Sequence, residues 1–194
     1  MKSVSFTRMA DGTAEEYAFL EVLEERFAEA LPDRLLAHIR LLDDSLSGYR
    51  LSRLDHCLQA ATRAHRNGEG DEYVAATLFH DIGDMLAPYA HSEMAAAVLR
   101  PYVSDRVHWI VKHHGVFQMY YYAHLTGGDR NARDIHRDHQ WFDDAVRFCE
   151  LYDQESFDPD YDSEPLAFFE PLVRRVFARP GVADAEQSAR FRDD

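Results

Sequence analysis

The chain has 194 residues, of which 46% are hydrophobic and 12% aromatic, enough for one globular domain with a substantial core. Acidic residues outnumber basic ones 35 to 21, and the net charge of −14 argues against binding to the phosphate backbone of nucleic acids. Two cysteines, Cys57 and Cys149, are too few for a disulfide framework, and no apolar run is long enough for a signal peptide or a membrane span. We therefore expect a single domain over residues 1–194, in the cytoplasm, with no nucleic-acid or membrane partner; the sequence leaves the oligomeric state open.

The elements expected along the chain are all helices, because apolar residues recur at helical intervals and no stretch alternates as a strand does. Residues 13–45 predict a helical hairpin that packs over a core formed by residues 50–155. Within that core, helices are expected to begin near Ser52, Asp71, His91 and Ser104, the last of them stopping at Gly115. Later segments are an aromatic-rich stretch (117–126), a polar loop (127–139), a long helix (140–153), a C-terminal helix (about 165–178) and a frayed end (180–194).

The adjacent pair His80 and Asp81 follows the apolar run 74–79, so an imidazole and a carboxylate meet in a buried setting. An ionised carboxylate there costs several kcal/mol unless it is paired or coordinates a cation. Four more imidazole and carboxylate groups lie on neighbouring predicted helices, namely His56, His91, His114 and Asp153. This ligand set without thiolates suits Fe, Mn, Co or Zn. We predict two ions that share Asp81, one held also by His56, His80 and Asp153, the other by His91 and His114.

The order of these residues resembles the metal-binding core of the HD-domain superfamily. The segments 54–60 and 75–83 and the run that starts at His91 most resemble its mixed-valent diiron oxygenases. This branch includes myo-inositol oxygenase and the enzymes that cleave the C–P bond of 2-amino-1-hydroxyethylphosphonate and its N-trimethyl analogue. The resemblance implies a helical bundle, two iron ions as Fe(II)/Fe(III), dioxygen as co-substrate and phosphate as product. It carries the metal-ligand roles onto the six residues above, with His113 as a rival to His114, and the catalytic role onto His80 and Asp81.

The expected substrate contacts depart from those of the aminohydroxyethylphosphonate enzyme. That enzyme has a Lys where this chain has Gln118 and a lid Glu where this chain has Tyr49, and its Ser-rich loop is replaced by residues 127–133. Cations for the phosphonate are expected from Lys112, Arg130, Arg133 and Arg137, and faces for a quaternary ammonium from Tyr49, Phe117, Tyr120, Tyr121 and Tyr122. The alternative for each cation is a solvated loop charge, and for the tyrosines it is core filling. The predicted substrate-binding set is Tyr49, Asp84, Gln118, Tyr121, Arg130 and Arg133.

The function predicted on this basis is oxidative C–P bond cleavage of a small 1-hydroxy-2-(amino or trimethylammonio)ethylphosphonate. The alternative enzyme is a metal-dependent phosphohydrolase of a nucleotide or small phosphate ester, in which a metal-bound hydroxide attacks phosphorus. A third possibility is a helical binding module that uses the metal only for stability. The three differ in whether phosphate release requires oxygen, does not require it, or is absent.

Overall fold

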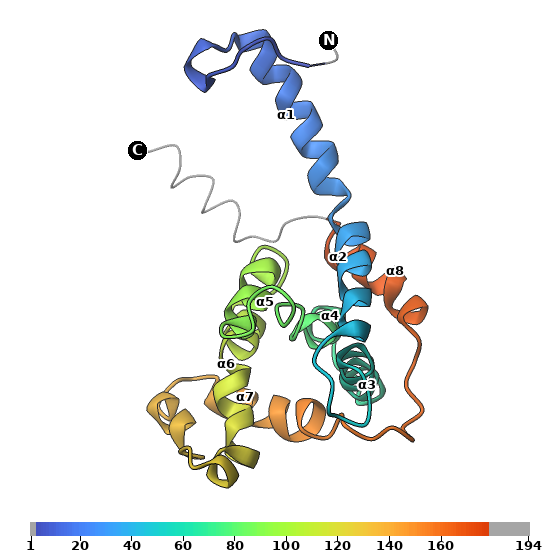
Figure 1. The fold of residues 1–194 in the computed structure, drawn as a ribbon, viewed down its shortest axis with the longest axis vertical. Helices are drawn as coiled ribbons and strands as arrows, with labels where there is room; N and C mark the ends of the chain where they lie inside the picture. Colours follow the sequence, from blue (N-terminus) through green and yellow to red (C-terminus); the bar gives the residue numbers. More distant parts are fainter. Residues whose placement is uncertain (1–2, 179–194) are drawn as a thin grey trace.

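The computed structural model describes residues 3–178, and over that range the protein is built from helices with no strand (Figure 1). This confirms the predicted all-α fold. The α-helices are α1 (Ala14–Glu29), α2 (Leu31–Ile39), α3 (Arg53–Arg66), α4 (Asp71–Phe79), α5 (His91–Leu99), α6 (Asp105–Tyr122), α7 (Phe142–Phe148) and α8 (Leu166–Val176). Short 3-10 helices cover Met9–Asp11, Arg40–Asp44, Ala123–Thr126 and Ala132–His136, and a π-helical turn covers Cys149–Asp153. The predicted frayed end, residues 180–194, lies outside the described residues.

Local capping explains where the central helices begin. Ser52 accepts a hydrogen bond from the amide of Asp55, and the Asp55 carboxylate accepts one from the amide of Ser52, which forms a capping box at the start of α3. At the start of α6, the Ser104 side chain accepts a hydrogen bond from the amide of Val107. Both positions agree with the helix starts expected from the sequence.

The core is one hydrophobic cluster between α3 and α4, α5 and α6, with α7 and the π turn closing one side and α8 covering α4. Its largest fully buried side chains include Phe79, Phe117, Phe148, Tyr152 and Phe169. Burial of each such ring stabilises the fold by roughly 1.5–3 kcal/mol. The helices around the cluster are thereby fixed relative to one another, which is what allows side chains from four of them to meet.

The predicted N-terminal hairpin is not formed, although both of its helices are. Figure 1 shows α1 continuing outward beyond α2 and away from the bundle. Apolar side chains that were expected to pack on the core are exposed, among them Val22, Leu23 and Phe27, the last at 66%. Only α2 contributes to the core, through Leu35, Leu36 and Ile39. The helical periodicity of α1 is correct, but within residues 3–178 these apolar side chains stay exposed, and Phe27 contacts the guanidinium of Arg34 in α2, 3.7 Å from the ring centre.

The start of α1 is held instead by the residues before it. The amides of Ser5 and Thr13 donate hydrogen bonds to the Glu16 carboxylate, and these bonds lower its pKa to about 2. Thr13 and Glu16 also form a capping box. The N-terminal arm and α1 thus form a local unit whose hydrogen bonds do not involve α3 to α6.

The predicted end of the helix that begins at Ser104 is also wrong. Helix α6 runs through Gly115 to Tyr122, so most of the aromatic-rich stretch is helical. A Cβ atom at Gly115 would lie 2.9 Å from Oγ of Ser92, at the start of α5. A larger residue here would require the Ser92 side chain to rotate away, which shows that α5 packs closely on α6 at this point, while the backbone stays helical. Among residues 3–178, no helix combines the length and apolar character needed to cross a membrane.

Candidate metal centre

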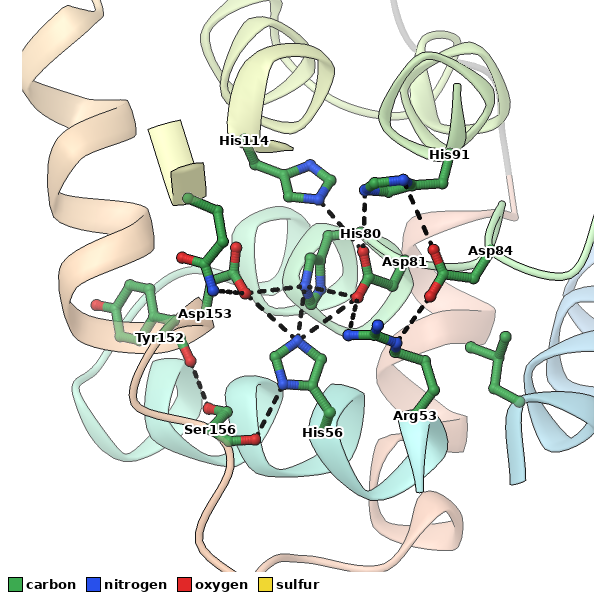
Figure 2. A network of polar contacts seen from close by, with 12 residues as sticks. Arg53, His56, His80, Asp81, Asp84, His91, His114, Tyr152, Asp153 and Ser156 are labelled. Carbon is green, nitrogen blue, oxygen red and sulfur yellow. Dashed lines mark hydrogen bonds and ion pairs between the residues drawn. The ribbon is translucent and has the colours of Figure 1, made fainter. Parts of the chain in front are cut away.

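Six imidazole and carboxylate side chains converge in the middle of the bundle (Figure 2). Each comes from a different place in the fold except for the adjacent pair: α3, the turn after α4, the start of α5, the middle of α6 and the π turn. Their ligand atoms form three overlapping groups, each of which could hold a metal ion. The residues are the six predicted ligands, His56, His80, Asp81, His91, His114 and Asp153, and all except the half-buried His91 are buried.

Asp81 lies at the middle of this cluster and presents one oxygen to each half. Its Oδ2 lies 3.6 Å from Nε2 of both His56 and His80. Its Oδ1 lies 3.5 Å from Nε2 of His91 and 3.3 Å from Nε2 of His114. A carboxylate arranged in this way can contribute one oxygen to each of two ions, which is the sharing expected from the sequence.

Asp153 completes one of the two halves. Its Oδ1 lies 3.4 Å from Nε2 of His56 and 3.7 Å from Nε2 of His80. The sequence predicts an ordinary helix up to this residue, whereas the structure has a π-helical turn over Cys149–Asp153. Single π turns change the direction of the side chains that follow them and are frequent at functional sites. Periodicity alone could not have predicted this one, because the apolar pattern continues through it.

The imidazole rings are oriented by hydrogen bonds on the side away from the centre. Nδ1 donates to a backbone carbonyl in three of them: to Ser156 from His56 at 2.9 Å, to Thr77 from His80 at 2.7 Å and to Val111 from His114 at 2.7 Å. Because a carbonyl can only accept, each Nδ1 carries the proton and each neutral ring directs the lone pair of Nε2 into the centre. This outer support is characteristic of histidines that bind metals.

Two of these nitrogens lie so close together that their approach is unfavourable unless a positive charge lies between them or on one of them. Nε2 of His56 and Nε2 of His80 are 3.1 Å apart. In the neutral tautomers just described, both are lone pairs and repel. A proton or a metal ion bound at this point removes the repulsion, and the nearby oxygens of Asp81 and Asp153 add to its stabilisation. The donor set therefore fits a cation.

The charges of the centre confirm that the carboxylates remain ionised. Burial acts to raise the pKa of Asp81, but His80, His114 and Arg53 outweigh it and the pKa lies well below the usual range. Burial likewise opposes ionisation of Asp153, and the imidazoles of His56 and His80, when one of them carries a proton on Nε2, lower its pKa. For His80, burial lowers the pKa, yet the two carboxylates raise it overall. Protons and metal ions consequently compete for the same nitrogen.

Arg53 is a residue of the site that the sequence analysis missed. Its Nη1 lies 3.1 Å from Oδ2 of Asp81, and its Nε lies 2.7 Å from Oδ2 of Asp84. The side chain is only 15% exposed. The available signal was its place three residues before His56, on the same face of α3. A single arginine at a helix start has no other distinguishing feature in the sequence.

Asp84 and Gly83 explain how His91 reaches the cluster. Oδ1 of Asp84 lies 3.6 Å from Nδ1 of His91 and so faces the outer side of that ring. A Cβ atom at Gly83 would lie 2.6 Å from the carbonyl oxygen of His91, so only glycine permits this approach. Helix α4 ends at Phe79, which leaves His80 and Asp81 in the turn that follows it.

A cavity of about 710 Å³ opens onto the centre. It is lined by Asp81, His91, His114 and Asp153, by the aromatic side chains of Tyr89 and Tyr122, and by two cations, Arg53 and Lys112. Four of the six predicted substrate contacts line it: Tyr49, Asp84, Gln118 and Tyr121. The cavity thus gives a small molecule access to the shared carboxylate.

The loop arginines do not reach this cavity. Arg130 and Arg133 lie over the ring of Tyr120, 4.2 Å and 3.7 Å from its centre, and Arg137 pairs with Asp134 at 2.8 Å. Phe117 is fully buried in the core and does not line the cavity. These residues stabilise the polar loop and the core, as the alternative interpretation of the sequence allowed.

His113, the rival to His114, points elsewhere. Its Nδ1 donates to the carbonyl of Trp109 at 2.8 Å, and its ring packs against those of Trp109 and His136. A one-residue step along a helix turns a side chain by about 100°, so only one member of the pair can face the centre. The structure places His114 there.

Comparison with known proteins agrees with this geometry. A family model described as HD domain matches residues 53–153, just over half of the chain. The matched range starts at Arg53, ends at Asp153 and contains all six converging side chains. No curated protein matches the chain significantly.

Proposed function

The chain belongs to the HD-domain family, and from this premise we propose that it is a metal-dependent enzyme with two ions at the centre of the bundle. One ion is held by His56, His80, Asp81 and Asp153, and the other by Asp81, His91 and His114. The observation that carries this proposal is the pair of Nε2 lone pairs 3.1 Å apart, which only a cation or a proton reconciles. The second half of the cluster has the same form, with two imidazoles directed at the other oxygen of Asp81.

We propose further that the enzyme is a diiron oxygenase acting on a small 1-hydroxy-2-(amino or trimethylammonio)ethylphosphonate. Two iron ions, as Fe(II) and Fe(III), would supply Lewis acidity toward the substrate oxygens and a redox-active site for dioxygen, whose four electrons come from the C–H and C–P bonds of the substrate. In the overall reaction one C–H and one C–P bond of the hydroxyl-bearing carbon break, one molecule of dioxygen is consumed, and a carboxylate and phosphate form. The support for this finer proposal is the local similarity of the ligand segments and the character of the cavity.

The protein groups around the cavity suit such a substrate. A phosphonate carries negative charge, and Arg53 and Lys112 are the Arg and Lys side chains that line the cavity among the described residues. Arg53 is held by Asp84 through Nε, so its orientation is fixed before a ligand arrives. The rings of Tyr49, Tyr121 and Phe157 line the same space and can face an ammonium group.

The experiment compares oxygen-dependent with oxygen-independent phosphate release. Protein reconstituted with Fe(II) without oxygen is exposed to air with each hydroxyphosphonate, and oxygen uptake and phosphate are measured together. We expect one phosphate for each dioxygen consumed and a loss of at least about 100-fold in Asp81→Asn, because both ions lose a ligand. Asp162→Asn is the matched control, since the Asp162 side chain is 99% exposed and belongs neither to the six converging side chains nor to the lining of the cavity.

Two other outcomes would contradict the oxygenase proposal. Phosphate released from phosphate esters without oxygen by the Mn- or Co-loaded protein, with no oxygen uptake on any hydroxyphosphonate, would identify a phosphohydrolase. No turnover of either class, combined with unfolding of Asp81→Asn, would identify a binding module that uses metal for stability.

A further inference from the structure

A buried carbonyl in the turn that follows α4 takes its hydrogen bond from outside the turn. The carbonyls of Phe79, Asp81 and Gly83 accept bonds from amides of the turn itself. The carbonyl of Ile82 accepts from no backbone amide in the described part of the chain, and Ile82 is only 2% exposed. Its donor is Nε2 of His38, at 3.2 Å. A backbone carbonyl can only accept, so this nitrogen carries the proton.

His38 belongs to α2, a helix whose position is fixed by the rest of the fold. The side chains of Leu35, Leu36 and Ile39 anchor α2 in the hydrophobic core, and two ion pairs join it to α8. Helix α2 lies outside residues 53–153, the range that the HD domain model matches. The turn that carries Asp81 is therefore held from one side by a part of the chain that the family model does not include.

The same turn carries the groups that place the imidazole of His91. Oδ1 of Asp84 faces Nδ1 of His91 at 3.6 Å, and Gly83 lies against the backbone of His91. The peptide group between Ile82 and Gly83 thus joins the carbonyl that His38 binds to the glycine on which His91 packs. A buried carbonyl without a donor is unfavourable, so loss of the bond from His38 would let this peptide group turn toward another donor. Asp84 and His91 would shift with it.

We propose that His38 is a positioning residue for the ion held by Asp81, His91 and His114. This inference rests on the two-ion centre of the proposed function. His38 is not one of the side chains that could hold a metal, so it acts through the turn. The other half of the centre does not depend on the same bond, because its two imidazoles are oriented by the carbonyls of Ser156 and Thr77.

The test measures the two Mn(II) affinities of the full chain, without oxygen or substrate, from the free Mn(II) detected by electron paramagnetic resonance. In His38→Leu, which lacks the donor, one affinity should fall roughly 10-fold, as for other outer partners of metal ligands, and the other should change by less than about twofold. With Asp153→Asn disabling the other half, the ion that remains should show the same loss. His38→Gln, whose amide nitrogen can take the place of Nε2, should restore the wild-type affinity.

His65→Leu is the matched control. It makes the same substitution in a histidine of α3 whose ring packs on that of Phe168, with the ring centres 5.0 Å apart. Both Mn(II) affinities should equal those of the wild type. His38→Asn, whose amide is too short to reach the carbonyl of Ile82, is a second variant in case His38→Leu does not fold, and it should show the same loss. Thermal unfolding of each metal-free variant, measured before titration, shows that the comparison is made on folded chains.

Failure of this inference differs from failure of the proposed function. If the wild type binds two ions and the folded His38 variants bind both as tightly, or lose both affinities equally, the role of His38 is overturned while the proposed function stands. The same holds if His38→Gln does not restore the affinity, or if the loss is absent in the Asp153→Asn background. If the wild type binds fewer than two ions, the two-ion centre is overturned and this inference with it.

Discussion

The core that holds the candidate metal centre and the N-terminal helix α1 contain similar sequence patterns but have different surroundings. Both show apolar residues at helical spacing, and both form helices. In the core, helices far apart in sequence bury each other's apolar faces and bring buried polar groups together. Along α1, Val22, Leu23 and Phe27 remain exposed, and Glu16 is the only buried residue. A hydrophobic stripe therefore predicts a helix more reliably than it predicts the surface on which that helix packs.

The largest expected effect concerns the shared carboxylate of the core. Asp81→Asn should reduce metal content from two ions per chain to none, since each half of the cluster loses a negatively charged ligand. Asp153→Asn should remove only the ion on the side of His56 and His80. Elemental analysis after dialysis gives the stoichiometry. Hydrogen exchange on the same samples should accelerate in α3 and α4 and stay unchanged in α1. Equal metal loss in the two variants would contradict a bridging role for Asp81.

A smaller effect is expected on the free energy of unfolding when one phenylalanine is replaced in each region. Phe169→Ala removes a fully buried ring of α8 and should lower the free energy of unfolding by about 3–5 kcal/mol. Phe27→Ala removes a ring that is 66% exposed and should change it by less than about 0.5 kcal/mol. Denaturant unfolding of the two variants measures both values. A loss above about 2 kcal/mol in Phe27→Ala would show that the apolar face of α1 is covered in solution.

The smallest effect is the pH dependence of metal affinity, which concerns the core alone. Because Asp81 and Asp153 raise the pKa of His80 above its usual value, a bound proton must leave before this nitrogen can coordinate an ion. Metal affinity should therefore fall as pH decreases, by up to about tenfold per pH unit below that pKa. Titrations of Mn(II) at several pH values measure the dependence, and an affinity independent of pH between 6 and 8 would contradict it.

The raised pKa of His80 affects the stability of the metal-free protein in the opposite direction. Metal affinity increases with pH, whereas this contribution to stability decreases with pH. A histidine whose folded-state pKa is raised stabilises the fold below its unfolded-state pKa of about 6.5, and this contribution disappears as pH rises through the folded-state value. The difference in unfolding temperature between metal-loaded and metal-free protein should consequently grow with pH. Exchange at α1 should not follow this trend, because no group of the metal centre contacts it.

Much of the candidate site could be predicted from the sequence. The six side chains are unusual where they stand, since a charged or imidazole group beside a buried apolar run is costly unless it has a partner. The helix starts at Ser52 and Ser104 are local signals, because a capping side chain bonds only to the residues next to it. Loop residues gave the weakest predictions. Arg130 and Arg133 have the right charge for a phosphonate, but their positions depend on Tyr120 and on the path of the loop.

The sequence by itself determined that this chain is helical, where its central helices begin and which imidazole and carboxylate groups need a cation, since each of these depends on local propensity or on the cost of burying a charge. Only the tertiary structure decided that His114 and not His113 faces the centre, that Arg53 and Asp84 pair beside Asp81, that a π turn directs Asp153 inward and that the apolar side chains of α1 stay exposed within residues 3–178. Each of these depends on the relative placement of helices that are distant in sequence, and such contacts leave no periodic or local trace in the residues that make them.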